Sequence, residues 1–357
     1  MTENTTFFLG ANTPGGFHSL FHELYDPLDG WHAYILKGGP GCGKSTLMKT
    51  VAARLDAVGI GYETIRCTSD PDSLDALRIE SKKVCIADGT APHVLEPHYP
   101  GAAETTVDLS ACWDQAALRA NSAEIIRHFT ENAACHKRCV RFLQAAESLS
   151  RDVRRLTLEC LDADKIERYA ARFAARRFGT PRGTVGREAT RFLSAVTPHG
   201  ITVHRDTLEA LCDEVLVVED AHGAASAALL GQLRRYALGS GLDVIACPCP
   251  LHPDAGPQHL FLPQIRLGIV TENSFQRFDG DHTIHASRFT DAGALRAHRS
   301  RIAFSRRTEK ELLEEAVRAM RDALDVHDRL EALYRPAVDF DAVTHRTEQI
   351  TAEIVDL

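Results

Sequence analysis

Apolar residues recur along this chain in two series that follow one another in the same order. Each series predicts a short apolar strand, a helix with an apolar residue at every third or fourth position, and then two further strands. The first strands lie at 33–36 and 215–219, and the helices that follow stop near Gly59 and Gly239. This order of elements is typical of an α/β fold in each half of the chain.

The residues of the two series also match, at separations of 177 to 184 positions. FLGANTPGG begins at Phe8 and FLSAVTPHG at Phe192, and several later pieces pair in the same order. Helical sequence ends both series, where LDADKIERYAARFAARRF from Leu161 matches VDFDAVTHRTEQITAEIV from Val338. An internal duplication explains this pattern better than chance similarity between two α/β units.

The duplication predicts two three-layer α/β domains, each with an appended helical hairpin. The first domain would span 1–188, with its hairpin at about 112–178. The second would span 189–357, with its hairpin at about 294–357. Each half has enough residues to bury a core, so a fragment that ends near Glu188 is expected to fold alone.

A glycine-rich stretch, GGPGCGKST, follows the first apolar strand and opens the first helix. This context is that of a P-loop, in which backbone N–H groups and the helix N-terminus bind phosphate oxygens. A glycine-rich turn without a ligand is the alternative. The residues expected to contact a nucleoside triphosphate, most simply ATP, are Gly38, Gly39, Pro40, Gly41, Cys42, Gly43, Lys44, Ser45 and Thr46.

Two of these residues, Lys44 and Ser45, are expected to take part in catalysis or in metal binding. Lys44 would contact the β- and γ-phosphates, and the Ser45 hydroxyl is an expected ligand of Mg²⁺. The second metal carboxylate and catalytic acid is assigned to Asp88, which closes the apolar strand VCIAD, although a turn role before Gly89 is open. Asp70 and Asp72 could position water or substrate, or simply form a turn.

The second copy has lost the residues that bind phosphate. Ser226 stands at the lysine position, Ala227 stands at the magnesium hydroxyl position, and Asp220 brings an acid to the start of the loop. We therefore expect a degenerate loop. Alternatively, the strand VLVVED at 215–220 could complete the first P-loop within one large domain, but it precedes its helix, which favours Asp88 as the metal carboxylate.

Arginines on two helices are candidates for a contact with the triphosphate. One helix carries an i, i+4 stripe of Arg168, Arg172 and Arg176, which is either a solvated face or an approach to the γ-phosphate. Arg234 and Arg235 follow the lost loop. They would approach the nucleotide only if the second copy closed over the first.

Composition narrows the class of protein. The 357 residues are 44% apolar with a net charge of −8, so nucleic acid is not the expected partner, and no apolar run approaches the length of a membrane span. We expect a cytoplasmic protein without a membrane segment. Ten scattered cysteines indicate reduced thiols. A metal site at the Cys135–Cys139 or Cys247–Cys249 pair is a weaker alternative.

Five stretches, FFLGANTPGGF, ILKGGPGCGKSTLMK, SDPDSLD, ADGTAPH and YRPAVDFDAV, resemble a bacterial group of tandem P-loop ATP-binding proteins known as uncharacterised ATPases. The resemblance covers almost the whole chain. It implies two P-loop NTPase-type domains with nucleotide contacts at 38–46. The second copy of that family commonly carries a working loop, from which AHGAASAA departs. His93 in ADGTAPH is expected to be a structural histidine.

These observations favour an ATP-binding protein with ATP and Mg²⁺ as its cofactors. The first-ranked function is a Mg²⁺-dependent ATPase that acts as a conformational switch. A small-molecule or nucleotide kinase that transfers the γ-phosphoryl group ranks second. A nucleotide-sensing module with negligible turnover ranks third. The sequence does not identify a protein partner or an acceptor.

Overall fold

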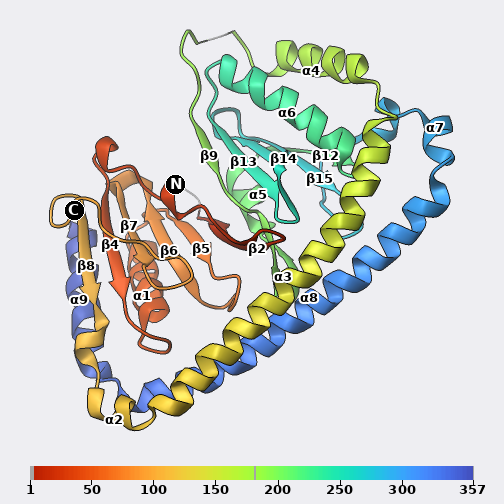
Figure 1. Cartoon of the computed structure of the whole chain (residues 1–357). Coiled ribbons are helices and arrows are strands. Elements are labelled where there is room, and N and C mark those ends of the chain that lie inside the picture. The colour runs from red at the N-terminus through yellow and green to blue at the C-terminus, as the bar shows by residue number, and fades with distance from the viewer. Residues whose placement is uncertain (1–3, 181, 357) are drawn as a thin grey trace.

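Two mixed six-stranded sheets form the centre of the computed structural model, which describes residues 4–180 and 182–356 (Figure 1). The first sheet has the strand order β1-β5-β6-β7-β4-β8, and the second has β9-β13-β14-β15-β12-β16. The strands at corresponding positions of the two sheets also follow one another in the same order along the chain. In each sheet one strand, β6 or β14, runs antiparallel to both of its neighbours.

The strands of the first sheet are β1 Thr5–Phe7, β4 His32–Lys37, β5 Glu63–Arg66, β6 Leu74–Ile79, β7 Val84–Asp88 and β8 Glu104–Asp108. Those of the second are β9 Glu188–Thr190, β12 Glu214–Glu219, β13 Val244–Cys249, β14 His252–Leu262, β15 Leu267–Glu272 and β16 His282–His285. Each half adds a small hairpin, β2 Gly10–Thr13 with β3 Gly16–Ser19, and β10 Ser194–Thr197 with β11 Gly200–Val203.

Helices α1 to α4 of the first half recur in order as α6 to α9 of the second. The α-helices are α1 Lys44–Ala57, α2 Gln115–Ala120, α3 Ser122–Leu158, α4 Ala163–Arg177, α5 Asp206–Leu211, α6 Ala224–Gly239, α7 Ala292–Arg296, α8 Arg299–Tyr334 and α9 Phe340–Asp356. Short 3-10 helices are η1 Phe21–Glu23, η2 Pro27–Asp29, η3 Glu80–Lys82, η4 Leu109–Cys112, η5 Pro263–Ile265, η6 Ala286–Phe289 and η7 Arg335–Ala337.

The two longest helices, α3 and α8, lie side by side and antiparallel (Figure 1). Arg301, near the start of α8, donates to Asp152, near the end of α3, at 2.6 and 2.7 Å. Near the opposite ends, the Asn132 amide donates to the Ala323 carbonyl at 2.8 Å. At 1.5 Å per residue each helix is about 55 Å long. Each one therefore carries the chain from one sheet to the other.

The helices that follow α3 and α8 are exchanged between the two halves. In α4 the apolar residues Ile166 and Ala170 are buried in the core of the second sheet, together with Leu229 of α6. Conversely, α9 of the second half buries Ile350 and Ile354 in the core of the first sheet, beside α1. The predicted hairpins within 112–178 and 294–357 are therefore wrong, because each long helix delivers its successor to the opposite sheet.

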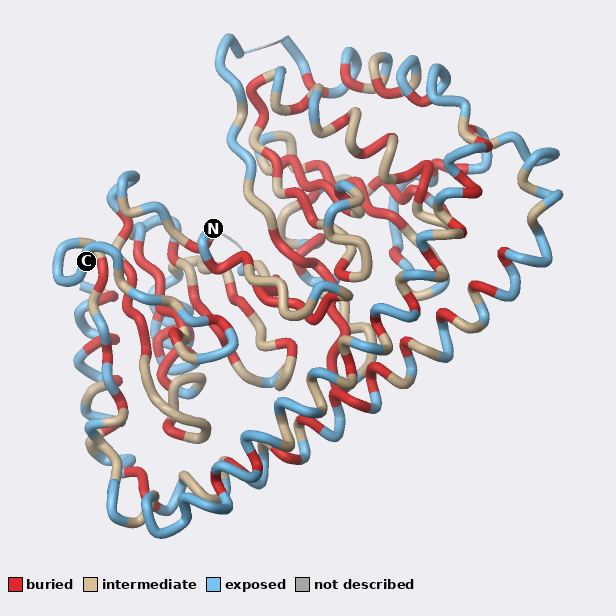
Figure 2. Tube along the Cα trace, in the orientation of Figure 1, coloured by how far each residue is buried: buried red, intermediate tan, exposed pale blue. Residues whose placement is uncertain are grey.

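A single hydrophobic core joins the inner faces of the two sheets. Phe8 and Phe192 exchange backbone hydrogen bonds at 2.9 Å in both directions, and the rings of Phe7 and Phe261 meet edge to face. Figure 2 shows buried residues along the strands of both sheets and along the seam between α3 and α8. The expected boundary at 188/189 thus does not separate two independent cores. Each sheet is covered by helices on one face and packs against the other half of the chain on its opposite face.

None of the helices in the described part of the chain is both long enough and apolar enough to cross a membrane. The two longest, α3 and α8, carry charged residues throughout their length. All ten cysteines are free, as expected for reduced thiols.

Candidate functional site

The glycine-rich loop connects β4 to α1 at the edge of the first sheet where β4 ends. Gly41 and Gly43 have φ values of +66° and +94°, which lie in the left-handed region that glycine adopts without strain. Gly43 caps α1, and the helix begins at Lys44. The strand, loop and helix therefore follow one another as predicted, and the N-terminus of α1 faces the loop with its partial positive charge.

Lys44 and Asp88, predicted to share the site, lie together in the structure. The Lys44 ammonium donates to the carbonyls of Gly38 and Gly39 at 2.5 and 3.1 Å, and it lies 3.4 Å from Asp88 Oδ2. Asp88 reaches it because β7 runs parallel beside β4 and pairs Asp88 with Leu36. The lysine is thus held over the loop by groups that a phosphate oxygen could replace.

Asp88 and Ser45 also have local partners. Asp88 Oδ1 accepts from the backbone N–H of Thr90 at 2.8 Å and from its hydroxyl at 2.6 Å. This turn leaves Oδ2 directed at Lys44. The Ser45 hydroxyl accepts from the backbone N–H of Leu74 at 3.0 Å, which directs this oxygen toward the start of β6.

A cavity of about 600 Å³ lies over the loop, a volume typical of small-molecule sites. Its floor is the loop from Gly39 to Thr46, with Lys49 beside it. One wall carries the carboxylates Asp70, Asp72, Asp75 and Asp88, and the opposite wall carries His327, Glu331, Arg335 and Phe340 from the second half of the chain. The cavity therefore combines a cationic loop, a group of acids and a cover supplied by the other half.

The cover packs directly on the glycines of the loop. A Cβ atom on Gly39 would lie 2.7 Å from Tyr334 Cε1, and one on Gly41 would lie 3.4 Å from Arg335 Cγ. Arg335 also donates to Glu331 at 2.9 Å. Sequence reasoning did not assign these residues, although the stretch YRPAVDFDAV contains two of them, Tyr334 and Arg335.

A buried ion pair joins Asp75 to His93 at the back of the cavity. His93 Nε2 lies 3.0 Å from Asp75 Oδ2, and the two residues are 9% and 4% exposed. Burial lowers the pKa of His93, but the negative charges of Asp75 and Asp88 outweigh burial and raise the pKa above its ordinary value. His93 is therefore more than a packed aromatic ring, because it holds a carboxylate that lines the cavity.

Asp70 and Asp72 line the same cavity and also form a turn. Asp70 accepts from the Ser73 hydroxyl at 2.5 Å and from the Asp72 backbone N–H at 3.3 Å. These hydrogen bonds support the alternative in which Asp70 and Asp72 form a turn. Within residues 4–180 and 182–356, no group of three or more His, Cys, Asp or Glu could hold a metal ion.

The corresponding loop of the second half is occupied by its own acid. Asp220 is 5% exposed, and its carboxylate accepts from the backbone N–H groups of His222 and Ser226 at 2.9 and 2.8 Å. The N–H of Ser226 corresponds to that of Lys44, which binds phosphate in a working P-loop, whereas His222 corresponds to Pro40, which has no N–H. The strand before it, β12, lies between β15 and β16 of the second sheet. The alternative in which 215–220 completes the first P-loop is therefore wrong.

The arginines proposed from sequence lie elsewhere. Arg168, Arg172 and Arg176 are exposed on α4, which packs against the second half. Arg234 forms an ion pair with Glu188. The arginine that the structure does bring to the cavity is Arg335, on η7.

No protein-family model, curated protein or solved structure matches this chain. The resemblance to tandem P-loop ATPases remains a prediction from the sequence. Any assignment of function therefore depends on the chemistry of the site itself.

Proposed function

We propose that this chain binds ATP and Mg²⁺ over residues 38–46 and hydrolyses the γ-phosphate to switch the arrangement of its two halves. One observation carries the proposal: Lys44, at the start of α1, stands 3.4 Å from Asp88 at the edge of a cavity of about 600 Å³. A lysine, a helix N-terminus and a neighbouring carboxylate are the parts that phosphoryl transfer uses in P-loop enzymes.

Each side chain then has a role that follows from its chemistry. Lys44 exchanges its loop carbonyls for β- and γ-phosphate oxygens. Ser45 and Asp88 would hold Mg²⁺, which takes few protein ligands and keeps several waters together with phosphate oxygens. Asp75, held by His93, is placed to accept a hydrogen bond from the attacking water.

The switch follows from the origin of the cavity walls. His327, Glu331 and Arg335 come from α8 and η7 of the second half, whereas the phosphate loop belongs to the first. A triphosphate that contacts both walls binds more tightly when the two halves are close together, so it stabilises that closed arrangement. Hydrolysis removes the contacts of the γ-phosphate and with them this stabilisation. Because α8 runs to the second sheet, a movement of the cover extends across the molecule (Figure 1).

Phosphoryl transfer to a small acceptor is the second candidate, and the Asp75–His93 pair favours it. A buried carboxylate facing a cavity can accept the proton of an acceptor hydroxyl as readily as that of water. Measuring phosphate release from ATP with and without candidate acceptors separates the two functions.

We further propose that both halves are P-loop NTPase-like units from one duplicated ancestor. The equal strand orders of the two sheets, and the recurrence of α1 to α4 as α6 to α9, support this origin. The first unit keeps a working loop, and in the second the carboxylate of Asp220 occupies the loop N–H groups.

Titration calorimetry with MgATP tests the proposal, with Lys44→Ala compared against Ser226→Ala at the matching position of the second half. We expect one nucleotide per chain, an affinity loss of roughly 10- to 100-fold for Lys44→Ala from the lost charged hydrogen bonds, and no loss for Ser226→Ala. Asp88→Asn should lower turnover and the Mg²⁺ dependence of binding. Equal affinity of wild type and Lys44→Ala, or two nucleotides per chain, would contradict the proposal.

A further inference from the structure

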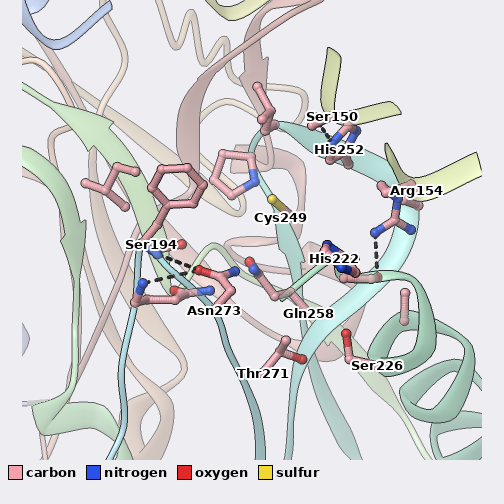
Figure 3. Close-up of a pocket in the computed structure, with 18 of the residues that line it drawn as sticks. Ser150, Arg154, Ser194, His222, Ser226, Cys249, His252, Gln258, Thr271 and Asn273 are labelled. Atoms are coloured by element: carbon pink, nitrogen blue, oxygen red, sulfur yellow. Dashed lines mark hydrogen bonds between the residues drawn. The ribbon is translucent and has the colours of Figure 1, made fainter. Parts of the chain in front are cut away.

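A second cavity, of about 110 Å³, lies in the other half of the molecule against the loop 221–223 (Figure 3). Its volume is several times the roughly 30 Å³ that one water occupies in the liquid. Helix α3 of the first half closes one side, just as α8 closes the cavity over the first loop. The apolar part of its wall consists of Val196, Ile201, Leu251, Phe275 and Leu313.

The two cavities occupy corresponding positions in the two halves. The ladder between β6 and β7 pairs Ala76 with Ala87, and the ladder between β14 and β15 pairs His259 with Val270, 183 positions later in both strands. With this register and the matching of the two loops, four charged or titratable residues at or beside the first cavity correspond to uncharged residues of the second. The replacements are Lys44 by Ser226, Asp75 by Gln258, Asp88 by Thr271 and His93 by Gln276.

The charges that do line the second cavity already have partners within the protein. Arg154 donates to the Gly223 carbonyl at 2.5 Å and interacts with the charge of Asp220. Arg306 lies 3.4 Å from Glu309 and donates to the Ser274 hydroxyl at 3.1 Å. An anion such as triphosphate would therefore have to displace internal partners, whereas an uncharged molecule would not.

Polar atoms without a hydrogen-bond partner gather in this cavity. Of eight such buried side-chain atoms in the described residues, four belong to residues of its wall: His222 Nδ1, Gln258 Oε1, Thr271 Oγ1 and one end of the Gln276 amide. Thr271 and Gln276 are only 1% and 4% exposed. A buried polar atom without a partner lowers stability, so half of these atoms in one cavity indicates a ligand that supplies the missing bonds.

The orientation of these atoms defines the ligand. His259 Nδ1 accepts from the backbone N–H of Thr271 at 3.3 Å, so the proton of this neutral ring is on Nε2. The Gln276 amide end that lies 3.4 Å from Nε2 must then be its oxygen, which leaves the amide NH₂ as the unpartnered group. Gln258 offers its oxygen, and Thr271 offers a hydroxyl (Figure 3). The ligand must therefore offer both hydrogen-bond donors and acceptors at this edge. Phe275 and Leu313 offer an apolar surface to the rest of it.

We infer that the second cavity binds a small uncharged molecule that donates and accepts hydrogen bonds along one edge and has a flat apolar face, as a nucleobase or a similar heteroaromatic amide does. This site is independent of the function proposed for the first loop. It gives the half with the lost phosphate loop a ligand of its own.

The first test uses the free protein and needs no ligand. Thr271→Val keeps the side-chain shape but removes the unpartnered hydroxyl, so it should raise Tm by about 1–4 °C if that group serves a ligand and not folding. Gln276→Leu removes the unpartnered end of the amide but also its contact with His259, so its Tm should rise less. Gln115→Leu, at an exposed position of α2, controls for the added apolar surface. A fall in Tm for both cavity variants would show that these groups are structural and would overturn the inference.

The second test uses adenine, uracil and nicotinamide as probes, each followed by saturation-transfer NMR on the full chain. We expect at least one probe to bind the wild type and to bind Gln276→Leu at least 10-fold more weakly, with Gln115→Leu unchanged. Failure of all three probes would overturn the ligand class proposed here. Binding that survives in Gln276→Leu would place the probe elsewhere and would equally overturn it.

Discussion

A fragment of residues 1–188 contains every strand of the first sheet, yet we expect it not to fold alone. Helix α9, which covers that sheet beside α1, belongs to residues 340–356. The four side chains that the fragment lacks in this core are all 9% exposed or less: Val338, Val343, Ile350 and Ile354. At about 1.5–3 kcal/mol for each buried aliphatic side chain, their loss amounts to about 6–12 kcal/mol. A domain is stable by only about 5–15 kcal/mol in total.

Circular dichroism during heating and amide NMR of the fragment measure this directly. We expect no cooperative transition and poor chemical-shift dispersion for 1–188 alone, because its own helix α4 also loses the second sheet on which it packs. Co-expression with 189–357 restores both helices to their sheets and should restore a cooperative transition near that of the intact chain. A fragment 1–188 that unfolds cooperatively by itself, at a similar Tm, would refute the exchange of helices.

Two further predictions concern single side chains. Burial raises the pKa of Glu309 to about 7, and the positive charge of Arg306 partly opposes this rise. The folded chain therefore keeps a proton on Glu309 that the unfolded chain releases near pH 4.5. The free energy of unfolding should fall by about 3 kcal/mol as pH rises from about 4.5 to about 7. Glu309→Gln should flatten that dependence in urea titrations at pH 5 and pH 8, and an unchanged slope would refute the assignment. Gly39→Ala should weaken MgATP binding in calorimetry because the new methyl group meets the Tyr334 ring at 2.7 Å, and Tyr334→Ala in the same chain should restore at least half of the loss. Simply additive losses in the double variant would show that the two residues do not interact.

Local sequence was sufficient to predict the first loop and its nearest partner. The spacing of glycines before Lys44 specifies a strand, a loop and a helix, and Asp88 could be placed because it ends an apolar strand. Parallel neighbours bring such strand ends together at one edge of a sheet. The register then sets the 3.4 Å between the two side chains.

The partners of the helices could not be predicted in the same way. The apolar stripe of α4, with Ile166 and Ala170, shows that one face is buried but not which sheet buries it. Both halves present similar apolar helices, so the periodicity of α9 fits either one equally well. The next helix reaches one sheet and not the other because α3 and α8 are each about 55 Å long, which a local pattern does not reveal.

The remaining site residues were missed for a related reason. Asp75 and His93 are 18 positions apart and meet only because β6 and β7 are antiparallel neighbours. Arg335 is almost 300 positions from the loop it covers. Contacts over such separations depend on the packing of whole elements, which no local pattern records.

The exchange of α4 and α9 bears on how such a chain could evolve. An ancestor with one half only would leave its sheet uncovered until a second copy lent it a helix, so that ancestor would exist as a swapped dimer. Once two copies were joined end to end, mutations could act on each loop separately. The half whose loop lacks the lysine could not then be deleted, because its last helix is part of the other half's core. Replacement of the lysine in the loop of one copy and retention of the fold of that copy are therefore compatible with the same architecture.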